Sequence, residues 1–418
     1  SSLANFGIGP SQVLHVRPRL LNYVRDPRMV KKGADAETTT LLKKNFACEG
    51  LSVDEGVTIR YQLSGVLGNE KNKIIGYDME KLNGLRAIWY MKDSIFFDPH
   101  LFGNLIGYGI ICGCCAGMVF ANRRSGYSFG KLCDEDNIKT LEQISGYFSF
   151  VVAIMLGMYV STGASRWWAM RNTCLGGLWT AINDINLLLA TRFRSHEDRP
   201  MKEKVLRLCL LSHRLLYAQA RDREGPEFLQ GIIDCGLMTP EEAAILKDEP
   251  AKAQIVWVWI SAIFVELKKA GKFDHWVLGT LEGSCAQAMN SIIKAFSYIH
   301  TLIPFNYAHL LATNVILANL LLVVKCGFVI GGEEIQKGPR NHFHLLAQLL
   351  ECMIVPFMYH AILGLVGQLE NPFGTDEVDF PCLSYHVVIR DEAETVIRMG
   401  ESSPDSLLDF MESGELAS

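Results

Sequence analysis

The sequence predicts an all-α integral membrane protein with four transmembrane helices and a helical extramembrane domain. The chain of 418 residues is 49% hydrophobic and 20% charged, which is more apolar than a typical soluble domain but leaves polar sequence for a part outside the bilayer. Four segments are apolar and long enough to cross a hydrocarbon core about 30 Å thick. Between the second and third segments, the apolar residues have the spacing of amphipathic helices.

The first span is predicted at 101–121, a run without a charged residue. Cys112, Cys114 and Cys115 lie in this run, and because the 12 cysteines show no paired spacing of a disulfide framework or a zinc site, we interpret them as small packing residues. Glycines recur in the same run at four-residue spacing, which lets a neighbouring helix approach closely, so we expect this face to be a helix contact. These glycines form two series: Gly103 and Gly107, and Gly109, Gly113 and Gly117.

The other three spans are predicted at 143–165, 301–324 and 343–369. The second ends in a cation and two indoles, which are typical of a membrane interface. The fourth contains Glu351 as its only formal charge. The third is uncharged but too polar to face lipid all round, so we expect it to face other protein or water. Its polar residues are Asn306, His309, Asn314 and Asn319.

Four crossings place both termini and the stretch between spans two and three on the same side of the membrane. Arginines near span two suggest that this side is cytoplasmic or its organellar equivalent, although the loop after span one is also basic. Because the chain starts at Ser1 without a methionine or a signal peptide, we expect a processed or truncated N-terminus. The predicted regions are an unassigned extension at 1–84, a first transmembrane pair at 85–168, a helical extramembrane domain at 169–300, a second transmembrane pair at 301–370, and a turn and tail at 371–418.

Local patterns add detail to the regions outside the membrane. Apolar residues at helical spacing predict a helical bundle, and they are Val205, Leu208, Leu211, Leu215 and Leu216. Thr239, Pro240 and Glu242 form the signature of a capped helix start. In the extension, 57–63 has the composition of a short strand. The net charge of −5 and the pI near 6.1 give no basic face, so nucleic-acid binding has little support.

Two stretches carry candidate chemistry. In span two, Phe150, Ile154 and Met158 recur every four residues and project from one face, where they could narrow a water-lined pathway or simply contact lipid or a neighbouring helix. After span four, Asp376 and Asp379 crowd a turn bent by a proline and a glycine. Their carboxylates and the turn's carbonyls could supply the oxygen ligands that calcium needs, or the turn could be a solvated cap on the next helix. No nucleophile with a base partner and no phosphate-binding loop has a convincing context, so an enzyme is not expected.

Three motifs resemble motifs of the bestrophin family, both in their residues and in their order along the chain. Animal-like, calcium-responsive members of the family are the most similar. The resemblance spans roughly 85–400 and departs from the family at Thr375 and Val378, which interrupt the acidic run, at 1–84, and in the short tail. The motifs are Arg166-Trp167-Trp168 after a Gly-Met-Tyr-Val segment, the turn Gly236-Leu237-Met238-Thr239-Pro240-Glu241, and Asn371-Pro372-Phe373-Gly374-x-Asp376-x-x-Asp379-Phe380.

The resemblance implies a homopentamer around one pore, with a hydrophobic neck in the membrane and an aperture deeper in the extramembrane domain. By position, the neck falls on Phe150, Ile154 and Met158, with phenylalanine and methionine exchanged relative to the animal pattern, and the aperture falls on Trp276. The implied calcium ligands are the side chains of Asp376 and Asp379, the carbonyls of Gln368 and Asn371, and one carbonyl near Tyr77.

The leading hypothesis is therefore a calcium-gated channel that passes chloride, bicarbonate or similar anions through a charge-free neck. It would lie in the lipid bilayer of a plasma membrane or of an organelle such as the thylakoid. A secondary transporter would show internal repeats and charges at the membrane midplane, which this chain lacks. A structural or regulatory membrane subunit with a vestigial pore is the alternative that the sequence leaves open.

Overall fold

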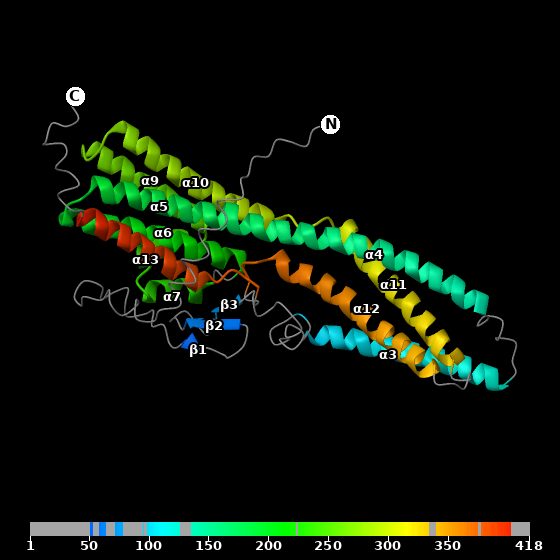
Figure 1. Cartoon of the computed structure of the whole chain (residues 1–418). Helices are drawn as coiled ribbons and strands as arrows, with labels where there is room; N and C mark the ends of the chain where they lie inside the picture. The colour runs from blue at the N-terminus through cyan, green and yellow to red at the C-terminus, as the bar shows by residue number, and fades with distance from the viewer. Residues whose placement is uncertain are drawn as a thin grey trace, which may run out of the picture.

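A computed structural model describes residues 51–52, 58–63, 72–77, 95, 98–125, 135–222, 225–333, 340–374 and 378–402 (Figure 1). The helices of these residues form two parts, one of long membrane helices and one of shorter helices packed side by side. The membrane part consists of α3 (Pro99–Ser125), α4 (Glu135–Ala169), α11 (Phe305–Glu333) and α12 (Arg340–Glu370). The second part consists of α5 (Gly176–Arg192), α6 (Arg199–Ala220), α7 (Pro226–Asp234), α8 (Pro240–Leu246), α9 (Lys252–Lys269), α10 (His275–His300) and α13 (Cys382–Glu401).

The four predicted spans are confirmed as helices long and apolar enough to cross a membrane, and the protein is an integral membrane protein. The third span is the most enclosed: half of its most apolar window is buried, against 17–22% in the other three. In the centre of the bundle, α11 packs against α3, α4 and α12. The prediction that span three faces other protein is confirmed within one chain by the full burial of Asn319, whereas Asn306 and His309 are exposed.

The predicted limits of the third span need correction at both ends. The helix begins at Phe305 rather than at residue 301, because Pro304 restricts the preceding residue and lies where a helix can start. It also continues past residue 324, where the sequence places a charge. That charge, Lys325, does not end the helix, because it is paired: its Nζ donates to both carboxylate oxygens of Glu351 on α12, at 2.9 and 2.8 Å.

The close contact between α3 and α11 comes from different glycines than those predicted. Among the described residues, no atom of another element lies within 4 Å of the position that a Cβ would take at any of the five α3 glycines. Instead, a Cβ added at Gly327 of α11 would lie 2.6 Å from Cys115 Cβ and 2.7 Å from Cys112 O. Gly331 approaches the Ala116 carbonyl in the same way, at 2.6 Å. Cys112 and Cys115 are packing residues as expected, but Cys114 is exposed.

Span two does not stop at the membrane. It continues through a π-helical segment, η5 (Met170–Leu175), into α5, so that one helical rod runs from 136 to 192. In the π segment the Gly176 N–H donates to the Arg171 carbonyl, a wider ring than in an α-helix. Figure 1 shows the rod extending along both parts of the protein. It carries the predicted neck residues at one end and a wall of the extramembrane domain at the other.

The extramembrane helices share one continuous hydrophobic core, which confirms the predicted bundle. All five apolar residues predicted on α6 are buried, and the largest fully buried side chain is Trp257 of α9, whose Nε1 donates to Ser212 Oγ at 2.8 Å. The capping box is also confirmed: Thr239 Oγ1 accepts from the Glu242 N–H, and Glu242 Oε2 accepts from the Thr239 N–H.

A small antiparallel sheet precedes the helices. It contains β1 (Leu51–Ser52), β2 (Thr58–Leu63) and β3 (Asn72–Tyr77), in the order β1-β2-β3. The strand predicted at 57–63 is confirmed by β2, which pairs with β3 in the register Thr58 opposite Tyr77. The rest of 1–84 lies outside the described residues. The described helices give the predicted all-α fold, to which this sheet is an addition.

Candidate functional site

The stripe on span two lies on the face of α4 that its own chain leaves uncovered. Phe150, Ile154 and Met158 are 67%, 50% and 62% exposed. The opposite face is fully packed, because Val152 and Leu156 are buried against α11. Tyr147 extends the uncovered apolar face toward the start of α4, and the exposed Val151 lies next to Phe150. The stripe therefore can contact lipid or the same face of another subunit, and it contains no charge.

The acidic turn begins where α12 ends, at Glu370. Its backbone is closed by two hydrogen bonds: the Gly374 N–H donates to Asn371 O at 3.3 Å, and the Phe380 N–H donates to Pro372 O at 2.7 Å. The Asn371 side chain accepts from the Phe373 N–H at 3.3 Å. The side-chain bond explains the asparagine in the motif, and the Pro372 carbonyl joins the start of the turn to its end at Phe380.

Two phenylalanines hold the turn against the extramembrane core. Phe373 and Phe380 are fully buried, and their rings meet edge to face with centroids 5.6 Å apart. Tyr217 of α6 packs against Phe373, and the Arg221 Nε donates to the Phe373 carbonyl at 2.6 Å. Phe373 and Phe380 therefore anchor the described residues of the turn in the core of the domain.

The turn also contacts the C-terminal end of α4 through Trp167. The Trp167 ring lies 4.9 Å from the Phe380 ring, and its Nε1 donates to the Val378 carbonyl at 3.3 Å. Arg166, the residue before it, donates to the Tyr298 carbonyl at 2.8 Å. The structure thus brings together two motifs that lie about 200 residues apart in the sequence. This contact explains why an arginine and an indole follow span two.

Two of the predicted calcium ligands converge over Gly374. A Cβ added at this glycine would lie 2.7 Å from Asp379 Oδ2 and 3.5 Å from the Asn371 carbonyl oxygen, so a larger residue would require the Asp379 side chain to move. Gln368 belongs to the last turn of α12, where carbonyls lack intrahelical partners and the helix dipole favours a cation. These oxygens suit a hard cation.

The remaining predicted ligands are less well defined. Asp376 lies outside the described residues, so its position relative to Asp379 stays a prediction. Tyr77 is the last residue of β3, and β3 lies against α13, the helix that follows the turn. Within the described ranges, no cluster of three or more histidine, cysteine or acidic side chains is arranged to hold a metal ion. A calcium ion would therefore depend on backbone carbonyls together with Asp376 and Asp379.

Trp276, the predicted aperture residue, lies in the first turn of α10 and is 71% exposed. In Figure 1, α10 begins at the end of the domain farthest from the membrane helices and then runs back toward α11. The start of α10 therefore belongs to the extramembrane part, whereas the stripe lies on the membrane helix α4. The exposure of Trp276 leaves it available to a pathway or a partner subunit.

Sequence reasoning missed two buried histidines behind the turn. His213 of α6 and His386 of α13 are almost completely buried, with ring centroids 6.0 Å apart. Burial lowers the pKa of His213 to about 3, and the charge of Arg214 acts in the same direction. Burial also lowers the pKa of His386 well below its usual range. Both rings are therefore neutral packing groups, and a lone histidine in a helix gives no sequence signal for such a role.

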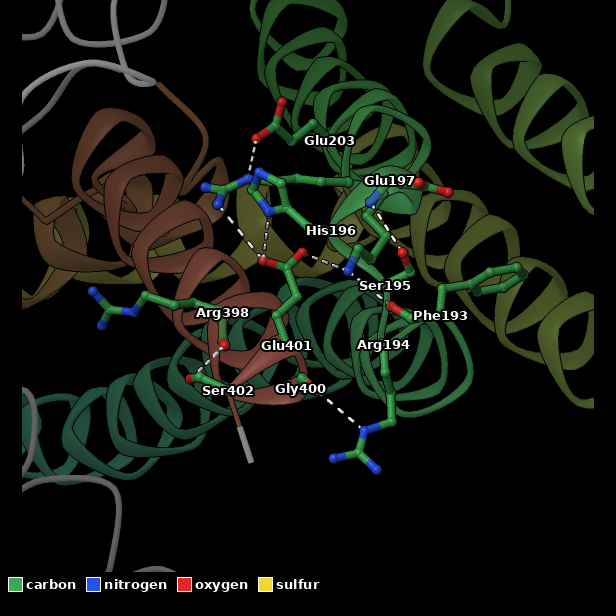
Figure 2. Close-up of polar contacts among 12 residues, drawn as sticks. Phe193, Arg194, Ser195, His196, Glu197, Glu203, Arg398, Gly400, Glu401 and Ser402 are labelled. Atoms are coloured by element: carbon green, nitrogen blue, oxygen red, sulfur yellow. Dashed lines mark hydrogen bonds and ion pairs between the residues drawn. The ribbon is translucent and has the colours of Figure 1, made fainter. Parts of the chain in front are cut away.

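The end of α13 is fixed to the domain by a second unpredicted contact (Figure 2). Lys202, which is fully buried, donates to Glu401 Oε1 at 2.6 Å and to the Phe193 carbonyl at 2.8 Å. Burial alone would raise the pKa of Glu401, but the hydrogen bond and charge of Lys202, together with Arg199, lower it overall. The helix after the acidic turn is thus held at both ends.

The chain has four membrane helices, and one of them, α4, carries an uncharged apolar stripe. The acidic turn contacts the C-terminal end of the same helix. These features define an integral membrane protein with the organisation of a channel subunit. The chain belongs to the bestrophin family. The family profile described as "Bestrophin, RFP-TM, chloride channel" matches residues 129–391, more than half of the chain. The family consists of channels rather than enzymes. No match was found among curated proteins.

Solved structures have the same fold. One variant of a bacterial bestrophin homologue from Klebsiella pneumoniae has a TM-score of 0.55 at 16% identity, over 70% of this chain and 97% of that chain. Another variant has a TM-score of 0.56 at 15% identity, over 70% and 98% of the two chains. A crystal structure described only as a membrane protein gives 0.57 at 16% identity, over 72% and 99%. The family resemblance is confirmed, while the animal-like, calcium-responsive subtype stays a prediction.

Proposed function

We propose that the protein is one subunit of a homopentameric, calcium-gated anion channel that passes chloride, bicarbonate or similar anions passively. The observation that carries this proposal is the attachment of the acidic turn to the base of α4. Trp167 hydrogen-bonds to the turn and packs on Phe380, and the candidate neck lies on the same helix. A ligand that changes the turn therefore acts directly on the helix that would line the pore.

The neck would be formed by Phe150, Ile154 and Met158 from five subunits. Their side chains are exposed on one chain and carry no charge, as a ring of apolar groups around an axis requires. Such a constriction gates by drying, and it favours anions that lose water easily. The positive edges of the Phe150 rings would meet those anions without a buried lysine. Large, weakly hydrated anions are therefore expected to permeate better than chloride, and cations poorly.

Calcium would be held by Asp376 and Asp379 with the carbonyls of Gln368 and Asn371. All these donors are oxygens on a bent backbone, which suits calcium, whereas zinc prefers nitrogen or sulfur. A ligand shifts a gating equilibrium only if it binds the open state more tightly than the closed state. The direct contact between Val378 and Trp167 gives the turn a route by which its state can favour one position of α4.

The neck is tested by replacing Phe150, Ile154 and Met158 together with alanine. Removing the large side chains widens the constriction and abolishes its drying barrier, so anion current in reconstituted bilayers should become constitutive. A matched control replaces three equally exposed apolar residues of α3, Ile106, Ile110 and Met118, and should leave gating unchanged. Unchanged conductance in the neck variant would exclude this stripe as the gate. Because a vestigial pore predicts no current at all, the parent protein also tests the structural-subunit alternative.

The calcium site is tested with the double variant Asp376→Asn and Asp379→Asn. Removing two anionic ligands at constant size should weaken calcium binding by more than about tenfold and shift the calcium dependence of the current equally. Asp248→Asn removes an exposed carboxylate elsewhere in the domain and should change neither quantity. A double variant that binds and responds like the parent would place the calcium site elsewhere. Imaging of the purified protein tests the assembly, because a monomer or dimer would contradict a shared pore.

A further inference from the structure

The ion pair between Lys325 and Glu351 lies inside the membrane bundle. Lys325 is about two helical turns from the end of α11, roughly 12 Å, and Glu351 is about three turns from the start of α12. Both residues fall within the candidate spans 305–332 and 343–370. An ionised side chain at this depth is costly unless it has a partner, and such residues usually serve a function.

The two partners differ in their access to the surface of the bundle. The Lys325 side chain is 6% exposed, whereas the Glu351 side chain is 35% exposed. The carboxylate is therefore the more accessible partner, while the ammonium group stays enclosed. Protonation of Glu351 would remove the negative partner and leave a buried positive charge, which is strongly unfavourable unless another anion replaces the carboxylate.

The surroundings of the pair offer further hydrogen-bonding groups. Gln348 lies one turn before Glu351 on the same side of α12; it is 8% exposed, and its Oε1 has no hydrogen-bond partner among the described residues. The thiols of Cys326 and Cys352, each directly after one member of the pair, contact one another. A buried amide, whose unpartnered atom is the acceptor oxygen, and two thiols are therefore the polar neighbours of the pair along the two helices.

Other titratable groups are present on the helices packed around the pair. On α4, the first two turns carry charged residues that are exposed, Asp136, Lys139 and Glu142. The thiols, phenols and imidazoles on α3 and α12 include Cys112, Cys114, Cys115 and Tyr108 on α3, and His344, Tyr359 and His360 on α12. Tyr108 and His360 hydrogen-bond to each other at 2.9 Å. Within the described residues of the spans, Lys325 is the one buried lysine or arginine.

We propose that Lys325 and Glu351 form a proton-linked binding site for one small monovalent anion, with chloride as the simplest example, inside each subunit. In the step, Glu351 takes up one proton from water, its ion pair with Lys325 is lost, and one chloride binds the ammonium group. The net charge of the site is zero before and after. This site is separate from the stripe on α4, and it does not depend on whether the proposed neck conducts.

Equilibrium binding of radioactive chloride to the purified protein tests the site. Glu351→Gln imitates the protonated carboxylate, so this variant should gain one saturable chloride site per chain at neutral pH relative to the parent. The matched control, Lys325→Met with Glu351→Gln, keeps the same neck but has no ammonium group, and it should lose that site. Equal chloride binding by the single and double variants would overturn the proposal.

A second measurement covers the case in which Glu351→Gln does not fold. Chloride, compared with gluconate, should raise the thermal unfolding midpoint of the parent protein in acidic buffer but not in neutral buffer. The variant with methionine at both 325 and 351 should show no chloride effect at either pH, because replacing both charges by apolar groups removes the site without leaving a buried ion. The same chloride effect in the parent and in this variant would assign the binding to another place and overturn the proposal.

Discussion

The membrane helices and the extramembrane bundle bury their residues by different rules. The bundle encloses one continuous apolar core, in which the residues with helical spacing are those that pack. The described membrane helices share two small buried clusters and expose large apolar side chains over most of α3 and α4. In the bundle, contact follows apolarity because water surrounds the domain. In the membrane, lipid is as apolar as leucine, so close backbone approach and polar partners decide which faces meet.

The sharpest test of this contrast removes one large side chain from each part. Trp257→Ala deletes the largest buried side chain of the bundle, together with its hydrogen bond to Ser212, and should lower the free energy of unfolding by about 3–5 kcal/mol. Ile110→Ala removes an exposed side chain of α3 and should change it by less than about 0.5 kcal/mol. Chemical unfolding in detergent micelles measures both. Equal losses would show that α3 depends on its apolar face for packing within the chain.

The second test addresses close approach in the membrane. Gly327→Ala places a methyl group within 2.7 Å of the α3 backbone, so the helices must separate, and the protein should lose about 1–3 kcal/mol of stability. Gly113→Ala adds the same group to α3 where no neighbour lies within 4 Å, and it should be neutral or stabilising by up to about 1 kcal/mol. If Gly113→Ala were the more damaging change, the α3 glycines would contact another subunit.

The third and smallest effect is the pH dependence of the α13 end. Because the pKa of Glu401 is lowered in the folded protein, its contact with Lys202 contributes fully above the usual glutamate pKa near 4.5 and is lost as pH falls below it. Hydrogen exchange at the end of α13 should therefore quicken on acidification. In Glu401→Gln it should be fast already at neutral pH and respond little to acid. An unchanged pH response in this variant would show that another group controls the helix end.

The sequence predicted most of the fold because apolar runs and capping signals are local. The predicted third span is too short because Lys325 was taken as its end. The sequence held a signal against this, since Glu351 is an isolated opposite charge in the next span and could pair with Lys325. It assigned the helix contact to α3 because spacing alone cannot show which face meets a neighbour, and these spans differ little from face to face in apolarity. The acidic turn was located by motif, but its attachment to Trp167 joins distant segments and has no local signature.

The unbroken rod from 136 to 192 has a mechanical consequence. At about 1.5 Å per residue it is roughly 85 Å long, so it is both part of the membrane bundle and a wall of the domain. A straight α-helix resists torsion, and a twist applied to α5 must either rotate α4 or be absorbed where the hydrogen-bonded ring is widest. That place is Met170–Leu175, three residues beyond Trp167. The stiffness of this short segment therefore sets how much of any torque from the domain reaches Phe150, Ile154 and Met158.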